Sequence, residues 1–455
     1  MNTQVSRNCI YSVTQISVES DMIRKYNVVY PLMIKTIFFS LIICQLYGQS
    51  VYNLSDCLEI ASKNNPSLKI SRLWVESAQS GKQGSWSNIL PSANYSMTRS
   101  TQKSYYSPQY DLDIPTQEFY SGVVSLSQNI FDGGQWRNQM RASDNNYWSS
   151  QLAEQNNRIT IALNVKKTFY QYLEDLQLLE VAKQSNELAK QQMELVEHQY
   201  EIEAVARTDL LKQKVRLGNS KVEFLNQQVA VKNSLNQLSN IMGIGLGSDF
   251  VVVDTPEDLE IIESFQHYWE IVQANNPTLM VKKSQIKGAE LSLKISMGAV
   301  YPSLSTLLYY DATGDGINYL FSDFKDNWRF QTRLTLSYPI FTGLLRKNQI
   351  EQAKIDFKIQ NEEYRDIFNN LEVQLDLIIL QLNNIQTILP IFETTKVSAE
   401  EDLRLAQKRY NLGAATIFDV LDAQLSVTRA NSSLVRVVYD EKILRAELKA
   451  LLGEI

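Results

Sequence analysis

The sequence predicts a mainly helical fold with a membrane β-barrel portion, built from two copies of one structural unit. Three observations lead to this fold class. Helix breakers are scarce, because 17 glycines and 10 prolines among 455 residues make about 6% where roughly 12% is usual. One sequence pattern recurs far along the chain at a nearly constant offset. Two segments alternate apolar and polar residues as membrane strands do.

Composition excludes several classes of function. Hydrophobic residues make up 44% of the chain and charged residues 21%, which is ordinary for an ordered protein. A net charge of -6 gives no electrostatic support for binding nucleic acid. The histidines are His198 and His267 alone, which leaves little material for a metal site or for acid–base catalysis. We therefore expect no cofactor, no metal and no enzymatic activity.

The N-terminal segment, residues 1–48, has the features of an export signal. Lys35 precedes the short apolar run 37–43, and Gly48 offers the small residue that a signal peptidase needs. The run is too short to cross a bilayer as a helix, which takes ~20 residues. We expect a signal peptide starting at Met33 behind an upstream extension of the start; a frayed helix is the alternative. Cys44 leaves lipidation open.

The remaining chain is a tandem repeat. Residues 58–66 (LEIASKNNP) reappear as residues 269–277 (WEIVQANNP), which sets an offset of 211. From residues 130–131 (IF) onward the offset becomes 210, and it holds almost to the C-terminus. Chance does not keep register over such a distance, so the two halves are expected to share one structure.

Each half is expected to contain the same elements in the same order. We predict a first repeat over 49–245, a linker over 246–264 and a second repeat over 265–455. In each, a helix is followed by a β-hairpin, a very long helix and one more helix. The hairpins are predicted at 92–131 and 303–341.

The long helices are predicted from about Gly134 to Tyr200 and from Leu344 to Tyr410, roughly 100 Å each at 1.5 Å per residue. No globular core is that long, so a rod or tube is implied. In the second, apolar residues follow the alternating three-and-four spacing of a coiled coil and should pack on another helix of this protein. They are Phe368, Leu371, Leu375, Ile378, Leu382, Ile385 and Leu389.

The hairpins carry the membrane signal. Apolar residues on the last strand alternate with polar ones, as expected for a strand between lipid and a wet lumen. They are Trp328, Phe330, Leu334, Leu336, Tyr338 and Ile340, and in the first hairpin Val124, Leu126 and Ile130. A half-buried strand of a soluble protein is the alternative. Four strands leave open edges that lipid cannot satisfy, so several chains must share one barrel. Two chains would give eight strands and three would give twelve.

These features together resemble the TolC-like outer membrane efflux family over nearly all of the chain after the signal peptide. The resemblance rests on the duplicated Asn-Asn-Pro, on IFDGG at 130–134 and PIFTG at 339–343, and on RYNLG at 409–413 leading into DVLDAQ at 419–424. It implies a homotrimer with a twelve-stranded outer-membrane barrel and a periplasmic α-helical tunnel. Leu344 replaces the second glycine of the first junction, so we expect the second junction to be less bent.

The resemblance places the functional end at the turns that follow the long helices. Asp419 and Asp422 match the carboxylates that ring the narrow entrance of the family's tunnel, and a trimer would present six of them as a cation-attracting gate. The plainer interpretation makes Asp419 a helix-capping acid paired with Thr416 and places Asp422 on a solvated face.

Two further sets of tip residues follow from the resemblance. Tyr410, Asp209 and Thr208 match a latch that holds the entrance shut. The family's latch arginine is Ala415 here, and Arg207 could supply a charge only through a different geometry. The adaptor-docking tip comprises the small residues of the two turns. These residues are Gly413, Ala414, Ala204 and Val205.

The implied function is a passive exit channel in the outer membrane that extends into the periplasm. Its partners would be outer-membrane lipid, a periplasmic adaptor (membrane fusion) protein and an inner-membrane transporter of the RND, ABC or MFS type. Two alternatives are a periplasmic coiled-coil scaffold without a pore and an enzyme that uses Asp419 and Asp422 as acid and base. The apolar strand face argues against the scaffold, and the lack of a cleft argues against the enzyme. The cargo and the pump class stay open.

Overall fold

The computed structural model describes residues 50–245, 250–254, 261–322 and 324–454. The expected signal peptide at 1–48 lies outside the described residues, as does part of the expected linker. The chain divides into two compact units. The described part of the small unit is a parallel pair of strands, β1 (Ser50–Tyr52) and β6 (Phe250–Val252). The segment predicted as a linker therefore contains a strand.

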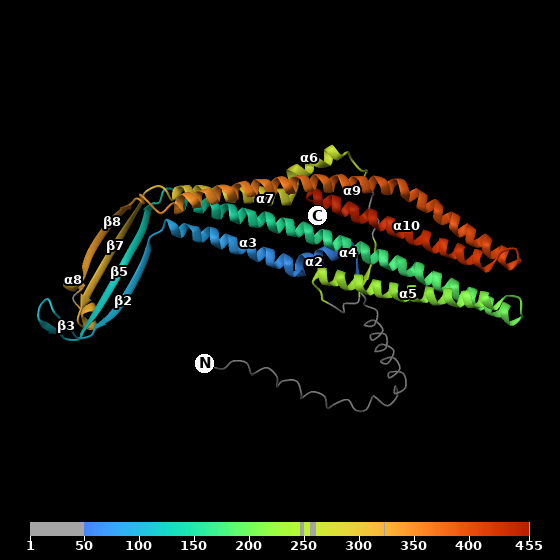
Figure 1. Ribbon diagram of the computed structural model, residues 1–455, viewed down its shortest axis with the longest axis horizontal. Helices are drawn as coiled ribbons and strands as arrows, with labels where there is room; N and C mark the ends of the chain where they lie inside the picture. Colours follow the sequence, from blue (N-terminus) through green and yellow to red (C-terminus); the bar gives the residue numbers. More distant parts are fainter. Residues whose placement is uncertain (1–49, 246–249, 255–260, 323, 455) are drawn as a thin grey trace, which may run out of the picture. The chain divides into compact units, whose positions relative to one another are not determined.

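The large unit holds all other elements, and its α-helices of eleven or more residues and the strands of its main sheet repeat in order (Figure 1). The hairpin tips differ, because the first holds β3 and β4 and the second holds η2 and α8. The first repeat consists of α2 (Leu54–Asn64), α3 (Pro66–Gly84), η1 (Ser85–Asn88), β2 (Ser92–Gln102), β3 (Tyr105–Ser107), β4 (Leu112–Ile114), β5 (Gln117–Phe131), α4 (Gln135–Glu201) and α5 (Arg207–Met242). The second consists of α6 (Phe265–Asn275), α7 (Pro277–Gly298), β7 (Ser303–Gly314), η2 (Ile317–Leu320), α8 (Phe324–Asn327), β8 (Arg329–Ser337), α9 (Leu345–Asn411) and α10 (Ile417–Leu452).

The predicted offsets hold between the two sets of helices. Helices α4 and α9 both have 67 residues, and α5 and α10 both have 36. Each pair starts 210 residues apart, whereas α2 and α6 start 211 apart. The long helices begin and end within one residue of their predicted bounds.

The duplicated Asn-Asn-Pro has the same structural role in both repeats. The side chain of Asn65 caps α3 by accepting from the backbone N–H groups of Ser67 and Leu68, and its amide donates to the carbonyl of Ile241 at 2.7 Å. Asn276 caps α7 and donates to the carbonyl of Leu451 at 2.9 Å. Each motif therefore starts one helix and ties it to the last turn of another, which satisfies exposed backbone groups at two helix ends at once.

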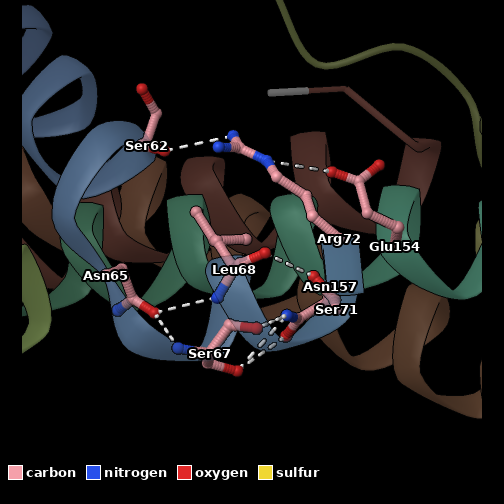
Figure 2. A network of polar contacts seen from close by, with 8 residues as sticks. All are labelled: Ser62, Asn65, Ser67, Leu68, Ser71, Arg72, Glu154 and Asn157. Atoms are coloured by element: carbon pink, nitrogen blue, oxygen red, sulfur yellow. Dashed lines mark hydrogen bonds and ion pairs between the residues drawn. The ribbon is translucent and has the colours of Figure 1, made fainter. Parts of the chain in front are cut away.

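Figure 2 shows how the first of these caps is joined to α4. The amide of Asn157 donates to the carbonyl of Ser67 at 3.1 Å, and Arg72 lies 3.9 Å from the carboxylate of Glu154. The neighbouring Asn156 accepts from Thr278, the counterpart of Ser67, at 3.3 Å. Adjacent amides of α4 thus hold the corresponding turns of both repeats.

Four β-strands of the large unit form an antiparallel sheet in the order β2-β5-β7-β8, and β3 and β4 pair with each other in a separate antiparallel ribbon. Its register aligns one apolar row across all four strands, Tyr95, Val124, Tyr310 and Phe330. The next row is polar except for Tyr309 and contains Asn94, Ser125, Tyr309 and Gln331. The predicted alternation therefore has the same phase in both hairpins, and residues such as Phe330 and Leu334 are 67% and 68% exposed.

Two expectations about the hairpins were wrong. Trp328 packs against the apolar face but is not exposed there: it is 8% exposed, stacks on Tyr310 and donates to the carbonyl of Leu320 at 3.2 Å. Strand β8 begins only at Arg329, and the preceding loop folds back onto the sheet.

Leu344 does not make the second strand-to-helix junction less bent: its φ is 66°, close to the 83° of Gly134. The fold imposes the same left-handed turn at a cost of roughly 1–2 kcal/mol.

The coiled-coil seam of α9 packs inside the chain, as predicted. Leu371, Leu375, Ile378 and Leu382 are buried in one cluster with residues of α6, α7 and α10, including Trp269. This cluster buries the apolar face of the long amphipathic helix α9, and such burial is the main source of stability for a helix of this kind.

Candidate functional site at the helical tip

The turns of the two helical hairpins lie at the end of the large unit opposite the sheet (Figure 1). Both have the same backbone geometry. In the first, the N–H groups of Glu203 and Ala204 donate to the carbonyls of Tyr200 and Gln199. In the second, those of Gly413 and Ala414 donate to Tyr410 and Arg409. Such bonds satisfy the last carbonyls of a helix and require a left-handed residue after it.

The left-handed position is occupied differently in the two turns. Gly413 has a φ of 72°, and its counterpart Glu203 has a φ of 60°. Of the predicted docking residues, Gly413, Ala414 and Ala204 are exposed. Val205 is half-buried and packs on a small core that joins both hairpins. That core contains Met193, Val196, Leu210 and Ile417, with Tyr410 against it.

Asp419 lies in the first turn of α10 and closes a capping box. Its carboxylate accepts from the backbone N–H of Thr416 at 2.7 Å and from the Thr416 hydroxyl at 2.8 Å. These hydrogen bonds hold the pKa of Asp419 below its usual value. Asp422 lies three residues on, and its side chain is exposed. The second tip thus presents two neighbouring carboxylates, one of which also caps its helix.

The predicted latch residues are only partly brought together. The hydroxyl of Tyr410 donates to Oε1 of Gln199 at 3.2 Å. Burial, and then the nearby charge of Asp209, raise the pKa of Tyr410. Thr208 is exposed, and its side chain makes no hydrogen bond to any described residue. The contact partner of Tyr410 on α4 is therefore Gln199, a residue to which no sequence motif pointed.

A second contact between the hairpins was also missed. Nζ of Lys212 lies 3.7 Å from the ring centroid of Phe418 and 3.9 Å from the carboxylate of Asp209. The repeat offset does not indicate this contact, but it shows that positions 209 and 212 correspond to 419 and 422. One tip therefore carries an acid paired with a base, and the other carries two acids.

Above the tip, α10 packs on α4 along a seam that contains titratable groups. Thr428 donates to Ser185 across it at 3.3 Å. Glu174 is 8% exposed there, and burial, together with the charges of Asp440 and Asp175, raises its pKa to about 7 although Arg436 opposes the shift. Lys442 lies over the rings of Tyr170 and Tyr439, both buried.

The corresponding seam in the other repeat is open. The counterparts of Tyr170 and Tyr439 are Leu380 on α9 and Val229 on α5, which are 64% and 59% exposed. Exposed apolar residues continue along both helices at heptad-like spacing. On α5 they are Leu211, Val215, Val222, Leu225 and Val229, and on α9 they are Val373, Leu377, Leu380 and Ile391. We call these two rows the α5 stripe and the α9 stripe.

Helix α9 contains an 18-residue stretch with a mean hydropathy of 1.4, of which 22% is buried within the chain. It is the one helix among the described residues that is apolar enough to cross a membrane by composition. Within the described part of the chain, no group of three or more His, Cys, Asp or Glu side chains could hold a metal ion.

Comparison with known proteins decides the family. The outer membrane efflux protein family matches residues 57–244 and 270–454, one segment in each repeat. The chain belongs to the outer membrane efflux protein family. It is 21% identical over 421 residues to the outer membrane protein TolC of Escherichia coli (strain K12), covering 88% of this chain and 82% of that protein.

Two further proteins illustrate the range of the family. The antibiotic efflux pump outer membrane protein ArpC of Pseudomonas putida is 20% identical over 388 residues, which cover 84% of this chain and 79% of ArpC. The outer membrane channel CmeC of Campylobacter jejuni has the same fold, with a TM-score of 0.80, 17% identity and coverage of 88% of this chain and 85% of CmeC. The TolC-like fold and the outer-membrane efflux channel predicted from the sequence are confirmed. Because the family is one of channels, the scaffold and enzyme interpretations fall away.

Proposed function

We propose that this chain forms a homotrimeric exit duct of a pump that spans the cell envelope. Three chains would close a twelve-stranded barrel in the outer membrane and a tunnel of helices in the periplasm. Cargo would enter at the tip from an inner-membrane transporter of the RND, ABC or MFS type through a periplasmic adaptor. The relatives named as components of efflux pumps support this assignment.

The main observation in favour of a shared assembly is that the seam between α4 and α10 is covered, whereas the equivalent surfaces of α5 and α9 are open. Within one chain α10 covers α4, whereas the equivalent surfaces of α5 and α9 are exposed. If α5 of one chain packs on α9 of the next, this contact repeats the packing of α10 on α4 within one chain. The α5 and α9 stripes are then buried. The burial of such apolar rows is the usual driving force for helix association in water.

The sheet supports the same closure. Within the described chain β2 and β8 each pair on one side only, and an open edge cannot persist in lipid. Pairing β8 of one chain with β2 of the next would remove all edges. Three chains would give twelve strands, whereas an eight-stranded barrel from two chains is filled by its own side chains.

The tip would act as the gate of this duct. Asp419 and Asp422 from three chains would place six carboxylates around the axis and attract cations there. The contacts of Tyr410 with Gln199 and of Lys212 with Phe418 would stabilise the closed packing. The exposed Gly413, Ala414 and Ala204, with Val205 beside them, would receive the adaptor. Opening would then be a population shift between two helix packings, biased by adaptor contacts.

Disulfide cross-linking tests the assembly. Thr428 and Ser185 touch across the closed seam, and the offset of 210 maps them to Gly218 on α5 and Thr395 on α9, both exposed. A cysteine at position 218 has room, since no atom lies within 4 Å of the added Cβ. We expect oxidised Gly218→Cys/Thr395→Cys protein to form covalent species that stop at the trimer.

The matched control is Ser185→Cys/Thr428→Cys, which should cross-link within one chain and leave the mass unchanged. Both variants are made in a Cys57→Ala background, although Cys57 is fully buried. Intrachain cross-links only, or a ladder that ends at the dimer, would contradict the proposed trimer.

A further inference from the structure

The polar face of strands β7 and β8 carries a continuous hydrogen-bonded ladder. Nη2 of Arg333 donates to the hydroxyl of Tyr309 at 3.0 Å, and that hydroxyl donates to Oε1 of Gln331 at 2.9 Å. The amide of Gln331 donates to Asp311 at 3.2 Å, and Asp311 also accepts from Arg329 at 3.0 Å. Five side chains from two strands are therefore held by one another.

Charge is unbalanced on this face. Register and alternation place three charged residues of the described strands there, namely Asp311, Arg329 and Arg333. The other face carries Arg99 and Glu118, which form an ion pair with each other. Asp311 is paired directly with Arg329. The polar face therefore keeps one net positive charge per chain.

Arg333 is the residue whose charge lacks an acidic partner among the described residues. Its guanidinium contacts the neutral Tyr309 through the hydrogen bond and through the ring, whose centroid lies 5.6 Å away. It is exposed and is the middle residue of β8, which spans Arg329–Ser337. A guanidinium has five N–H donors, so one bond to Tyr309 orients the group and leaves others for a ligand.

We propose that Arg333 makes the barrel lumen a binding station for anionic solutes that carry carboxylate or phosphate groups. This inference rests on the proposed trimeric duct, in which the polar face lines the lumen and three Arg333 side chains form a ring. An oriented guanidinium binds such anions through paired, charge-assisted hydrogen bonds. The ladder fixes the group before the anion arrives, which lowers the entropic cost of binding.

The ring has the opposite sign to the acidic tip. A cation-attracting entrance and an anion-attracting barrel would divide one duct into two electrostatic zones. Multivalent anions added on the barrel side should therefore block ion current, whereas multivalent cations should act from the tip side. The two zones can be tested separately because each is reached from its own side of the membrane.

The experiment is planar-bilayer recording of the purified protein at low salt, with inorganic pyrophosphate added on the barrel side. We expect wild-type current to be blocked, and Arg333→Gln to require about tenfold more pyrophosphate, as for the loss of one charge-assisted hydrogen bond. Arg333→Lys keeps the charge without the planar fork, so its block should be intermediate. Arg99→Gln removes an arginine from the outward face of the same sheet and should leave the block unchanged.

The outcomes separate the two proposals. A wild-type current whose pyrophosphate block survives Arg333→Gln overturns the anion station and leaves the duct in place. Equal loss of block in Arg99→Gln overturns it as well, because the effect then reports general surface charge. Wild-type protein that conducts no current at all would overturn the duct and, with it, the station.

Discussion

The two repeats have nearly the same backbone at the tip but different charges on it. In the first, Asp209 is paired with Lys212; in the second, the same positions hold Asp419 and Asp422. Helix lengths and the backbone hydrogen bonds of the turns agree between the two, although only α10 has a side-chain capping box. The comparison teaches that the two repeats share a scaffold because packing and hydrogen bonds constrain it, whereas their exposed side chains differ in charge.

The helix surfaces above the tips also differ in their side chains, although the helices correspond in the two repeats. The covered seam between α4 and α10 contains buried tyrosines and Glu174, whereas the α5 and α9 stripes are aliphatic and exposed. A seam formed within one chain is held by covalent connection and accommodates polar groups. In the proposed trimer the α5 and α9 stripes would meet between separate chains, whose association relies on apolar burial.

The largest effect is expected from removing the acidic pair of the second tip. Asp419→Ala/Asp422→Ala should raise single-channel conductance several-fold in planar bilayers and abolish block by multivalent cations, because the carboxylate ring would be gone. Lys212→Gln removes a cation at the position equivalent to Asp422 and should strengthen the block. If the currents are unchanged in both variants, Asp419 and Asp422 do not form the gate, and the charge difference between the tips has no effect on conductance.

The covered seam should make stability depend on pH. The pKa of Glu174 in the folded chain is raised to about 7, above the ordinary value of 4.5 for a glutamate, so the folded chain holds this proton more tightly than the unfolded chain. The resulting stabilisation is complete below about pH 4.5 and is lost as the pH rises through 7. Glu174→Gln should therefore raise stability at pH 8 by on the order of 2 kcal/mol and give little gain at pH 4.

Thermal unfolding of the mature protein in detergent at the two pH values measures this change. Glu180→Gln alters a more exposed acid on the same helix, with a side chain 53% exposed, and should show no such dependence. If Glu174→Gln gains the same stability at pH 4 and at pH 8, the pH dependence of the covered seam does not come from the titration of Glu174.

The smallest effect concerns the left-handed residue of each turn. Glu203→Gly should stabilise the first turn by about 0.5–1 kcal/mol, because glycine adopts a positive φ without strain. Gly413→Ala should destabilise the second by about 1 kcal/mol, a backbone effect alone since no atom lies within 4 Å of the added Cβ. Hydrogen exchange of the Ala204 and Ala414 amides reports on each turn. Slower exchange in Gly413→Ala would contradict the strain argument.

The candidate site shows where prediction from the sequence stopped. Periodicity and the repeat offset gave the helix bounds, and the capping box of Asp419 follows from Thr416 three residues earlier. The partners of Tyr410 and Lys212 could not be read in this way. Gln199 and Phe418 approach them from the other hairpin, and contacts between elements distant in the chain depend on how the helices are rotated against each other.

The sequence by itself determined the duplicated architecture, the long helices and the alternating strands, because these follow from local periodicity and from backbone hydrogen bonding within or between neighbouring segments. Only the tertiary structure decided that Trp328 is buried, that Leu344 adopts a left-handed turn and that α10 covers α4 while α5 and α9 stay open. Those outcomes depend on which surfaces meet, and side-chain packing between remote segments has no signature in a local sequence pattern.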